Sequence, residues 1–90
     1  MATPAQIAND MAFRAPFWRG RDKAIEGMCA DAARVIRTYL AGGRPDGRTV
    51  SGLLTRLYGA GKQDTDIAHA LSRAADTIQQ LRREARDDQA

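Results

Sequence analysis

The chain has 90 residues, of which 43% are hydrophobic and 28% charged, a composition typical of one folded domain rather than a disordered segment. A domain this small buries only about two-thirds of the surface of its unfolded chain, which leaves one core and little volume for a cofactor. The net charge of +3 divides into +5 for residues 1–63 and −2 for residues 64–90, and 12 of the 14 cations are arginine. Two explanations of the arginine content remain open. GC-rich coding raises Arg and Ala together, whereas an acidic partner would be matched by guanidinium forks, which suit phosphate and carboxylate groups.

The single cysteine and the lack of long apolar runs indicate in which cellular compartment the protein is expected. Cys29 is the only cysteine, which excludes an internal disulfide and a multi-cysteine metal site. The N-terminus lacks the basic start and apolar run of a signal peptide, and no apolar stretch approaches the roughly 18 residues of a membrane-spanning helix. We therefore expect a cytoplasmic protein without membrane contact, bound metal or cofactor.

The first expected helix opens with a capping box, in which Thr3 is the N-cap, Pro4 the first helical residue and Gln6 the reciprocal partner. Its apolar face consists of Ile7, Ala8, Met11, Ala15 and Trp18. Pro16 has no N–H to donate and its ring clashes with a preceding carbonyl, so we expect a kink or break at that residue.

The second expected helix spans about residues 22–41 and has the clearest apolar stripe of the chain. Asp22 begins it, and Gly42-Gly43 ends it with a left-handed turn. The stripe comprises Ile25, Met28, Cys29, Ala32, Val35, Ile36, Tyr39 and Leu40. Cys29 lies in the middle of this stripe and is expected to be buried and inert.

Two further helices follow a turn-rich loop. A short third helix is expected to begin at the N-cap Thr49, with Val50, Leu53, Leu54 and Leu57 facing inward. The fourth, at about residues 65–86, has apolar residues in a heptad pattern: Ile67, Leu71, Ala74, Ile78, Leu81 and Ala85. This pattern predicts an unbroken helix over residues 66–84.

The expected fold is an all-α, compact bundle of three to four helices. It forms a single domain over residues 1–90, with residues 87–90 frayed. Two long helices, a kinked N-terminal helix and a short third helix would share one core. The residues predicted to be in this core are Met28, Ile36, Leu54, Leu57, Leu71 and Ile78.

The sequence contains no group of residues with the spacing of a catalytic or metal-binding site. His69 is the only histidine, and Asp66 lies three residues before it, but no second imidazole or thiol completes a metal site. The glycine pairs at 42–43 and 59–61 follow helices rather than strands and are interpreted as helix stops, not phosphate loops. We therefore expect no enzymatic activity.

Residues 61–83 contain the pattern Gly61, Ile67, Ala68, Leu71, Thr77 and Ile78. This spacing resembles the helix-turn-helix of LuxR-type regulators and of the last DNA-binding region of sigma factors, and residues 50–57 would match the scaffold helix. The resemblance implies a turn between Leu71 and Thr77 and a recognition helix in the DNA major groove. The residues it would place against DNA are Asp76, Gln79, Gln80 and Arg83.

Aromatic and basic residues alternate over residues 13–21. Phe13 and Phe17 lie on a different helical face from Met11 and Trp18, so both faces cannot enter one small core unless the chain bends at Pro16. Two interpretations remain open: the rings complete the core, or they stay exposed beside Arg19 and Arg21. An exposed cluster of this kind is typical of a protein-binding hot spot and also suits stacking on single-stranded nucleic acid.

A second basic surface is expected on the outer side of the second helix and the loop after it. Its residues are Lys23, Arg34, Arg37, Arg44 and Arg48. They form either an ordinary solvated face or a surface that converges on an acidic or phosphate-bearing partner. The favoured hypothesis is a non-enzymatic inhibitor or adaptor that docks on a larger protein or nucleoprotein complex. By size and charge it is like phage and mobile-element products, anti-CRISPR inhibitors among them. The alternatives are a DNA-binding regulator and a ligand-binding assembly of several subunits.

Overall fold

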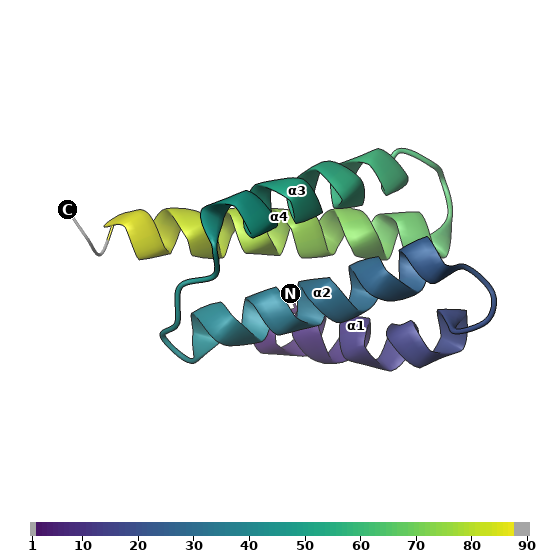
Figure 1. Ribbon diagram of the computed structural model, residues 1–90, viewed down its shortest axis with the longest axis horizontal. Helices are drawn as coiled ribbons and strands as arrows, with labels where there is room; N and C mark the ends of the chain where they lie inside the picture. Colours follow the sequence, from purple (N-terminus) through teal and green to yellow (C-terminus); the bar gives the residue numbers. More distant parts are fainter. Residues whose placement is uncertain (1, 88–90) are drawn as a thin grey trace.

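Four helices make up the part of the chain that the structure describes, residues 2–87 of a computed structural model (Figure 1). They are α1 (Pro4–Trp18), α2 (Lys23–Leu40), α3 (Gly47–Ala60) and α4 (Asp66–Asp87). Residues 2–87 contain no strand, which confirms the expected all-α bundle. Of the end expected to fray, Asp87 belongs to α4, and residues 88–90 lie outside the described part. None of the four helices carries an apolar stretch that could cross a lipid bilayer, within the residues described.

Helix α1 begins as the sequence predicts but ends later. Thr3 Oγ1 accepts from the backbone N–H of Gln6 at 3.2 Å, and Gln6 Oε1 accepts from the N–H of Thr3 at 2.8 Å. Of the kink or break expected at Pro16, the break is wrong, because the helix continues to Trp18. Pro16 lies in the last turn, so its missing N–H removes only one hydrogen bond before the helix ends. Gly20, with φ of 81°, then turns the chain towards α2.

Helix α2 has the two ends that the sequence predicts. The Asp22 carboxylate accepts from the N–H groups of the first turn, at 3.0 and 3.2 Å. At the other end Gly42 has φ of 85°, and its N–H donates to the carbonyl of Tyr39 at 3.0 Å. The N–H of Gly43 donates to the carbonyl of Thr38 at 2.8 Å. These two bonds form a Schellman motif and satisfy carbonyls that the last turn would leave unpaired.

Helix α3 begins earlier than the sequence indicates, while α4 has the predicted extent. The N-cap of α3 is Asp46 rather than Thr49, because the Asp46 carboxylate accepts from both the N–H and the hydroxyl of Thr49, at 3.0 and 3.1 Å. Helix α4 is continuous from Asp66 to Asp87, which confirms the unbroken helix over residues 66–84. The turn that a helix-turn-helix requires between Leu71 and Thr77 is therefore not formed.

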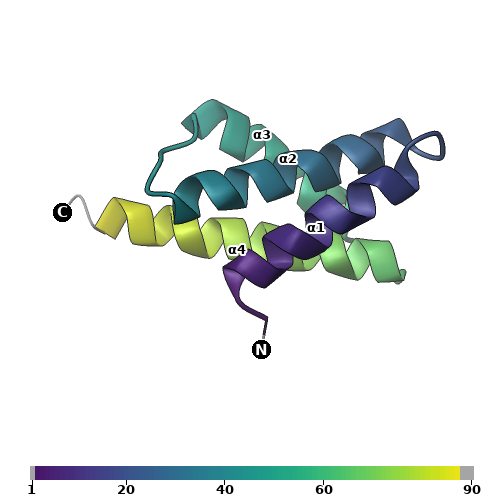
Figure 2. The same ribbon diagram turned by 90° about the horizontal axis from the view of Figure 1, so that it is seen from below.

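The helices form two antiparallel hairpins that pack on one another. Figure 1 shows α1 running beside α2, and α3 running beside α4. The view in Figure 2 shows that α1 crosses the first half of α4, while α3 lies on the other side of α2. Helix α1 therefore covers one side of the bundle and has no helix on its outer face.

The core lies between all four helices and contains every residue predicted for it. Ile36, Leu57 and Ile78 are fully buried, and Met28, Leu54 and Leu71 are at most 6% exposed. Several core positions on α2 and α4 are alanines: Ala32, Ala33, Ala70, Ala74 and Ala75. Leu40 is an exception to the predicted stripe, because it lies in the last turn of α2 and is 47% exposed.

Candidate binding surfaces

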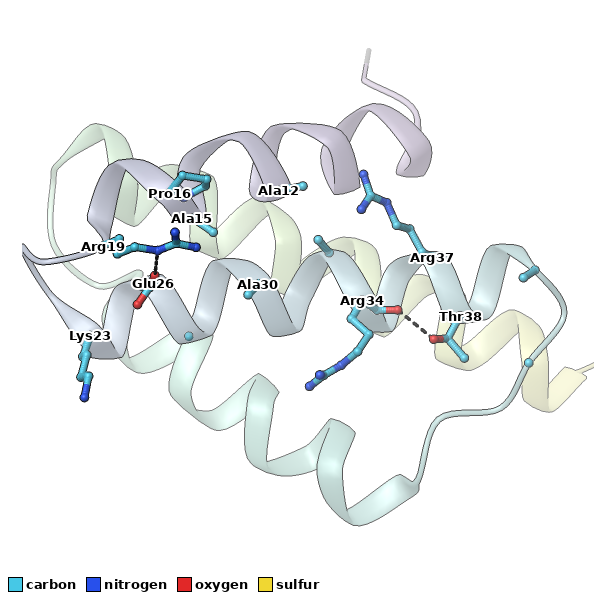
Figure 3. Close-up of a pocket in the computed structure, with 14 residues that line it drawn as sticks. Ala12, Ala15, Pro16, Arg19, Lys23, Glu26, Ala30, Arg34, Arg37 and Thr38 are labelled. Carbon is cyan, nitrogen blue, oxygen red and sulfur yellow. Dashed lines mark hydrogen bonds and ion pairs between the residues drawn. The ribbon is translucent and has the colours of Figure 1, made fainter.

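The structure divides the predicted binding residues between two surfaces on opposite sides of α1. One is a groove along α1 and α2, which we call the basic groove (Figure 3). The other, on the outer side of α1, contains Phe13 and Phe17 and is called the aromatic face. Only Arg19, Arg34 and Arg37 of the predicted arginines line the basic groove. Arg21 belongs to the aromatic face, since its guanidinium lies over the Phe17 ring.

Small residues form the floor of the basic groove, which is open and has a volume of about 1060 Å³. They come from α1, from α2 and from the residue that caps the C-terminal end of α2: Ala12, Ala15, Pro16, Gly27, Ala30 and Ala41. Because none of these side chains projects far from its helix, the backbone of a partner can come close to both helices. The floor is apolar and supplies no group for proton transfer or metal binding.

Cations stand on both sides of this floor. In Figure 3 Arg19 and Arg37 lie on the side of α1, whereas Lys23 and Arg34 lie on the side away from it. Glu26 is the only carboxylate among the residues that line the groove, and Arg19 Nε donates to it at 3.0 Å. The groove lining therefore has a formal charge of +3.

The neighbours of these cations leave most of the charge available to a partner. Arg34 contacts Asp31 at 2.7 Å, but Asp31 also contacts Arg56 of α3 at 3.2 Å, so one carboxylate serves two guanidinium groups. Arg37 donates to the neutral side chain of Asn9 at 3.0 Å. The side chain of Arg34 is 71% exposed. Exposed cations of this kind keep their hydration and can exchange a weak internal contact for one with a partner.

The aromatic face exposes two large rings. Phe13 is 82% exposed and Phe17 57%, whereas Trp18 is half-buried and meets Phe17 edge to face at 5.4 Å between ring centroids. The interpretation that all three rings complete the core is therefore wrong. Ile7, Ala8 and Met11 fill the inner side of α1, whereas Phe13 and Phe17 remain exposed.

A salt-bridge network borders the aromatic face and joins α1 to α4. Arg14 Nε donates to Asp10 at 2.9 Å, and Arg14 Nη1 donates to Asp66 at 2.8 Å. The contact with Asp66 raises the pKa of Arg14, and the guanidinium in turn lowers the pKa of Asp66. Between this network, the rings and Ile67 lies a hollow of about 480 Å³.

The remaining predicted residues lie elsewhere. Arg44 and Arg48 are exposed, and neither lines the basic groove, so the loop arginines do not extend it. Asp76 accepts a hydrogen bond from the Tyr58 hydroxyl at 2.9 Å. Burial is the largest cause of the raised pKa of Tyr58, and this hydrogen bond is the second. On the same helix Gln80 bonds Glu84, and Gln79 and Arg83 lie near Tyr58. These α4 residues share a surface without the turn that would present a recognition helix.

The histidine and the cysteine, the two side chains most often used in catalysis or metal binding, lie in separate parts of the described structure. His69 Nε2 lies 2.8 Å from Asp64, and in residues 2–87 no three His, Cys, Asp or Glu side chains gather as metal ligands would. Cys29 is fully buried, and burial raises the pKa of its thiol to about 11.

Comparison with protein-family models, curated proteins and solved structures finds no match for this chain.

Sequence reasoning identified the cations but missed how the structure groups them. The sequence groups Arg19 with the aromatic cluster, yet this residue lines the basic groove, because it follows the last residue of α1 and its guanidinium contacts Glu26 of α2. The floor of the groove was missed altogether. Its signal in the sequence is the outer stripe of α2, where Gly27 and Ala30 separate Lys23 from Arg34 at helical spacing.

Proposed function

We propose that this protein acts without catalysis, as a small inhibitor or adaptor that binds an acidic helix of a larger protein in the basic groove. The observation that supports this proposal is the combination of an apolar floor with cations on both sides. A partner helix with small apolar residues on one face and carboxylates at its flanks would match both features.

The shape of the groove favours a helix as the occupant. Helix axes in contact lie about 8–10 Å apart, and the closest approach requires small side chains at the crossing. The floor residues Ala12, Ala15 and Ala30 meet this requirement. Helix α1 has 15 residues and is therefore roughly 22 Å long, enough to accompany about four turns of a partner helix.

The chemistry of the floor favours a protein over a nucleic acid. A phosphate backbone is bound by cations and polar groups, and bases stack on aromatic rings. The floor presents methyl groups and a proline ring instead. The size of the chain and its arginine content also fit a phage or mobile-element inhibitor of the anti-CRISPR kind, in which case the host complex would supply the acidic helix.

The proposal is tested with a fluorescent helical peptide of about 20 residues, with an alanine and leucine stripe flanked by glutamates. Fluorescence anisotropy measures its binding to the wild type and to R34E/R37E. Each exposed ion pair is worth about 0.2–1 kcal/mol, so reversing two cations should weaken binding about tenfold or more. Binding should also weaken as salt is added.

A double reversal on α4, R73E/R83E, is the matched control, because it changes the charge equally and lies outside the groove. It should leave peptide affinity unchanged, and circular dichroism should show native helix content in both variants. A peptide with lysine in place of glutamate should not bind. The proposal fails if the two peptides bind alike, or if duplex DNA binds more tightly and only R73E/R83E abolishes this binding; the latter result would establish the DNA-binding alternative.

A further inference from the structure

The aromatic face is not needed for the fold of the monomer. Phe13 and Phe17 are the two most exposed large apolar side chains among residues 2–87, and they lie one turn apart on the outer side of α1. Helix α1 already buries its inner side through Ile7, Ala8 and Met11. Single exposed apolar residues are common, but two adjacent exposed rings beside a hollow are typical of an interaction surface.

The aromatic face contains both a projection and a recess. Phe13 is the most exposed of the rings and stands at the edge of the hollow of about 480 Å³, which it lines together with Phe17, Trp18 and Ile67. Pockets of roughly 300–1000 Å³ hold whole small ligands, so this hollow has room for one ring. A surface that carries both features can match a second copy of itself, as a twofold-symmetric interface requires.

The charges of the aromatic face are also complementary to themselves. At one end the carboxylates of Asp10 and Asp66 share the single guanidinium of Arg14, which leaves a net negative charge. At the other end Arg21 lies 4.5 Å from the centre of the Phe17 ring. If two α1 helices pack antiparallel about an axis near Ala15, Phe13 of one copy faces Phe17 of the other. One helical turn beyond these rings, Arg21 of each copy then lies opposite the acidic end of the other copy, which contains Asp10 and Asp66.

We propose that the aromatic face joins two copies of this chain in a twofold-symmetric dimer, with α1 packed antiparallel on α1. Phe13 of each copy enters the hollow of the other, and Arg21 of each copy pairs with Asp10 of the other. This interface is independent of the basic groove, which lies on the other side of α1 and stays open in the dimer.

The exposed area indicates a reversible dimer. A phenylalanine buries about 150–250 Å² when fully covered, so the exposed parts of Phe13 and Phe17, at 82% and 57%, offer roughly 210–350 Å² per copy. A stable interface buries about 800 Å² on each partner, and the surrounding residues supply only part of the difference. We therefore expect a weak, reversible dimer rather than a permanent one.

Sedimentation equilibrium over a range of concentrations tests the dimer. The apparent mass should rise from 9.8 kDa towards twice that value as the concentration passes the micromolar range. F13S should weaken association about tenfold or more while keeping native helix content, since that ring is 82% exposed. The groove variant R34E/R37E should dimerise like the wild type. Loss of peptide binding in R34E/R37E therefore tests the proposed function, whereas loss of self-association in F13S tests the dimer, and each proposal can fail without the other.

A charge exchange tests the antiparallel arrangement itself. R21E and D10K should each weaken self-association, because each brings like charges together. When the two variants are mixed, Glu–Lys and Arg–Asp pairs form across the interface, and association should recover. A protein that stays monomeric at all concentrations overturns the proposal. A dimer that is insensitive to F13S, or a mixture that fails to recover, overturns the assigned interface.

Discussion

Gly61, the residue that ends α3, provides a sharp test of the packing between α3 and α4. Its φ of −77° and ψ of 0° suit any residue, so backbone conformation does not require glycine there. Space does. A Cβ atom at this position would lie 3.0 Å from Cβ of Ser72, 3.1 Å from the carbonyl oxygen of Leu57 and 3.3 Å from that of Ala68. Two of these three atoms belong to helix backbones and cannot rotate away.

The expected effect of G61A follows from these distances. Forcing an extra methyl group into a packed site costs about 1–3 kcal/mol, and the smaller conformational freedom of alanine in the unfolded chain returns about 0.4–1 kcal/mol. The difference between the midpoints of these two ranges is a net loss of stability of about 1.3 kcal/mol. In a domain of this size each kcal/mol shifts Tm by about 4–8 °C, so Tm should fall by about 5–10 °C.

Gly59 is the matched control, because it lies two residues earlier, within α3, and a Cβ there would meet nothing within 4 Å. G59A should raise stability by about 0.5–1 kcal/mol through helix propensity alone. Thermal unfolding followed by circular dichroism at low protein concentration measures both variants without a contribution from self-association. If G61A melts at or above the wild-type temperature, the close approach of α3 and α4 is wrong.

Three further predictions concern the core and its titrating groups. I78A should cost about 2–5 kcal/mol in urea unfolding, because Ile78 is fully buried, and an unchanged midpoint would contradict the core. Cys29, with its pKa raised to about 11, should react with a thiol reagent at about pH 8 at least 100-fold more slowly in the native protein than in urea; equal rates would show it exposed. Because Arg14 lowers the pKa of Asp66 in the folded state, this carboxylate stabilises the fold above its unfolded value of about 3.9 and loses that effect as the pH falls through the folded value. D66N should therefore flatten the decline in stability towards acid pH, and parallel profiles for the two proteins would refute this contribution.

Local patterns predicted the ends of most helices because the determining contacts are local. The Thr3 cap and the glycine turn after α2 each depend on atoms within a few residues. The start of α3 shows the limit of such reasoning. Asp46 and Thr49 are both good N-caps, and the N–H and hydroxyl of Thr49 are themselves bonded by the Asp46 carboxylate. Side-chain type alone could not rank the two.

The candidate surfaces were less predictable because they depend on how the helices pack. Helical periodicity gave α1 two apolar sides, but only the bundle decides that Met11 is buried and Phe13 exposed. The alanines of the groove floor are the same residue type as those of the core, so composition could not separate them. Gly59 and Gly61 likewise look equivalent as helix stops, although only the second lies against another helix.

Trp18 gives the protein its own optical reporter. It is the only tryptophan, so all indole emission under selective excitation comes from one site. Its ring is half-buried and lies edge to face against Phe17, at the border of the aromatic face. Covering that border would remove water from the indole and shift its emission to shorter wavelength, whereas unfolding would shift it to longer wavelength. The unmodified chain can therefore distinguish association from unfolding in a single spectrum.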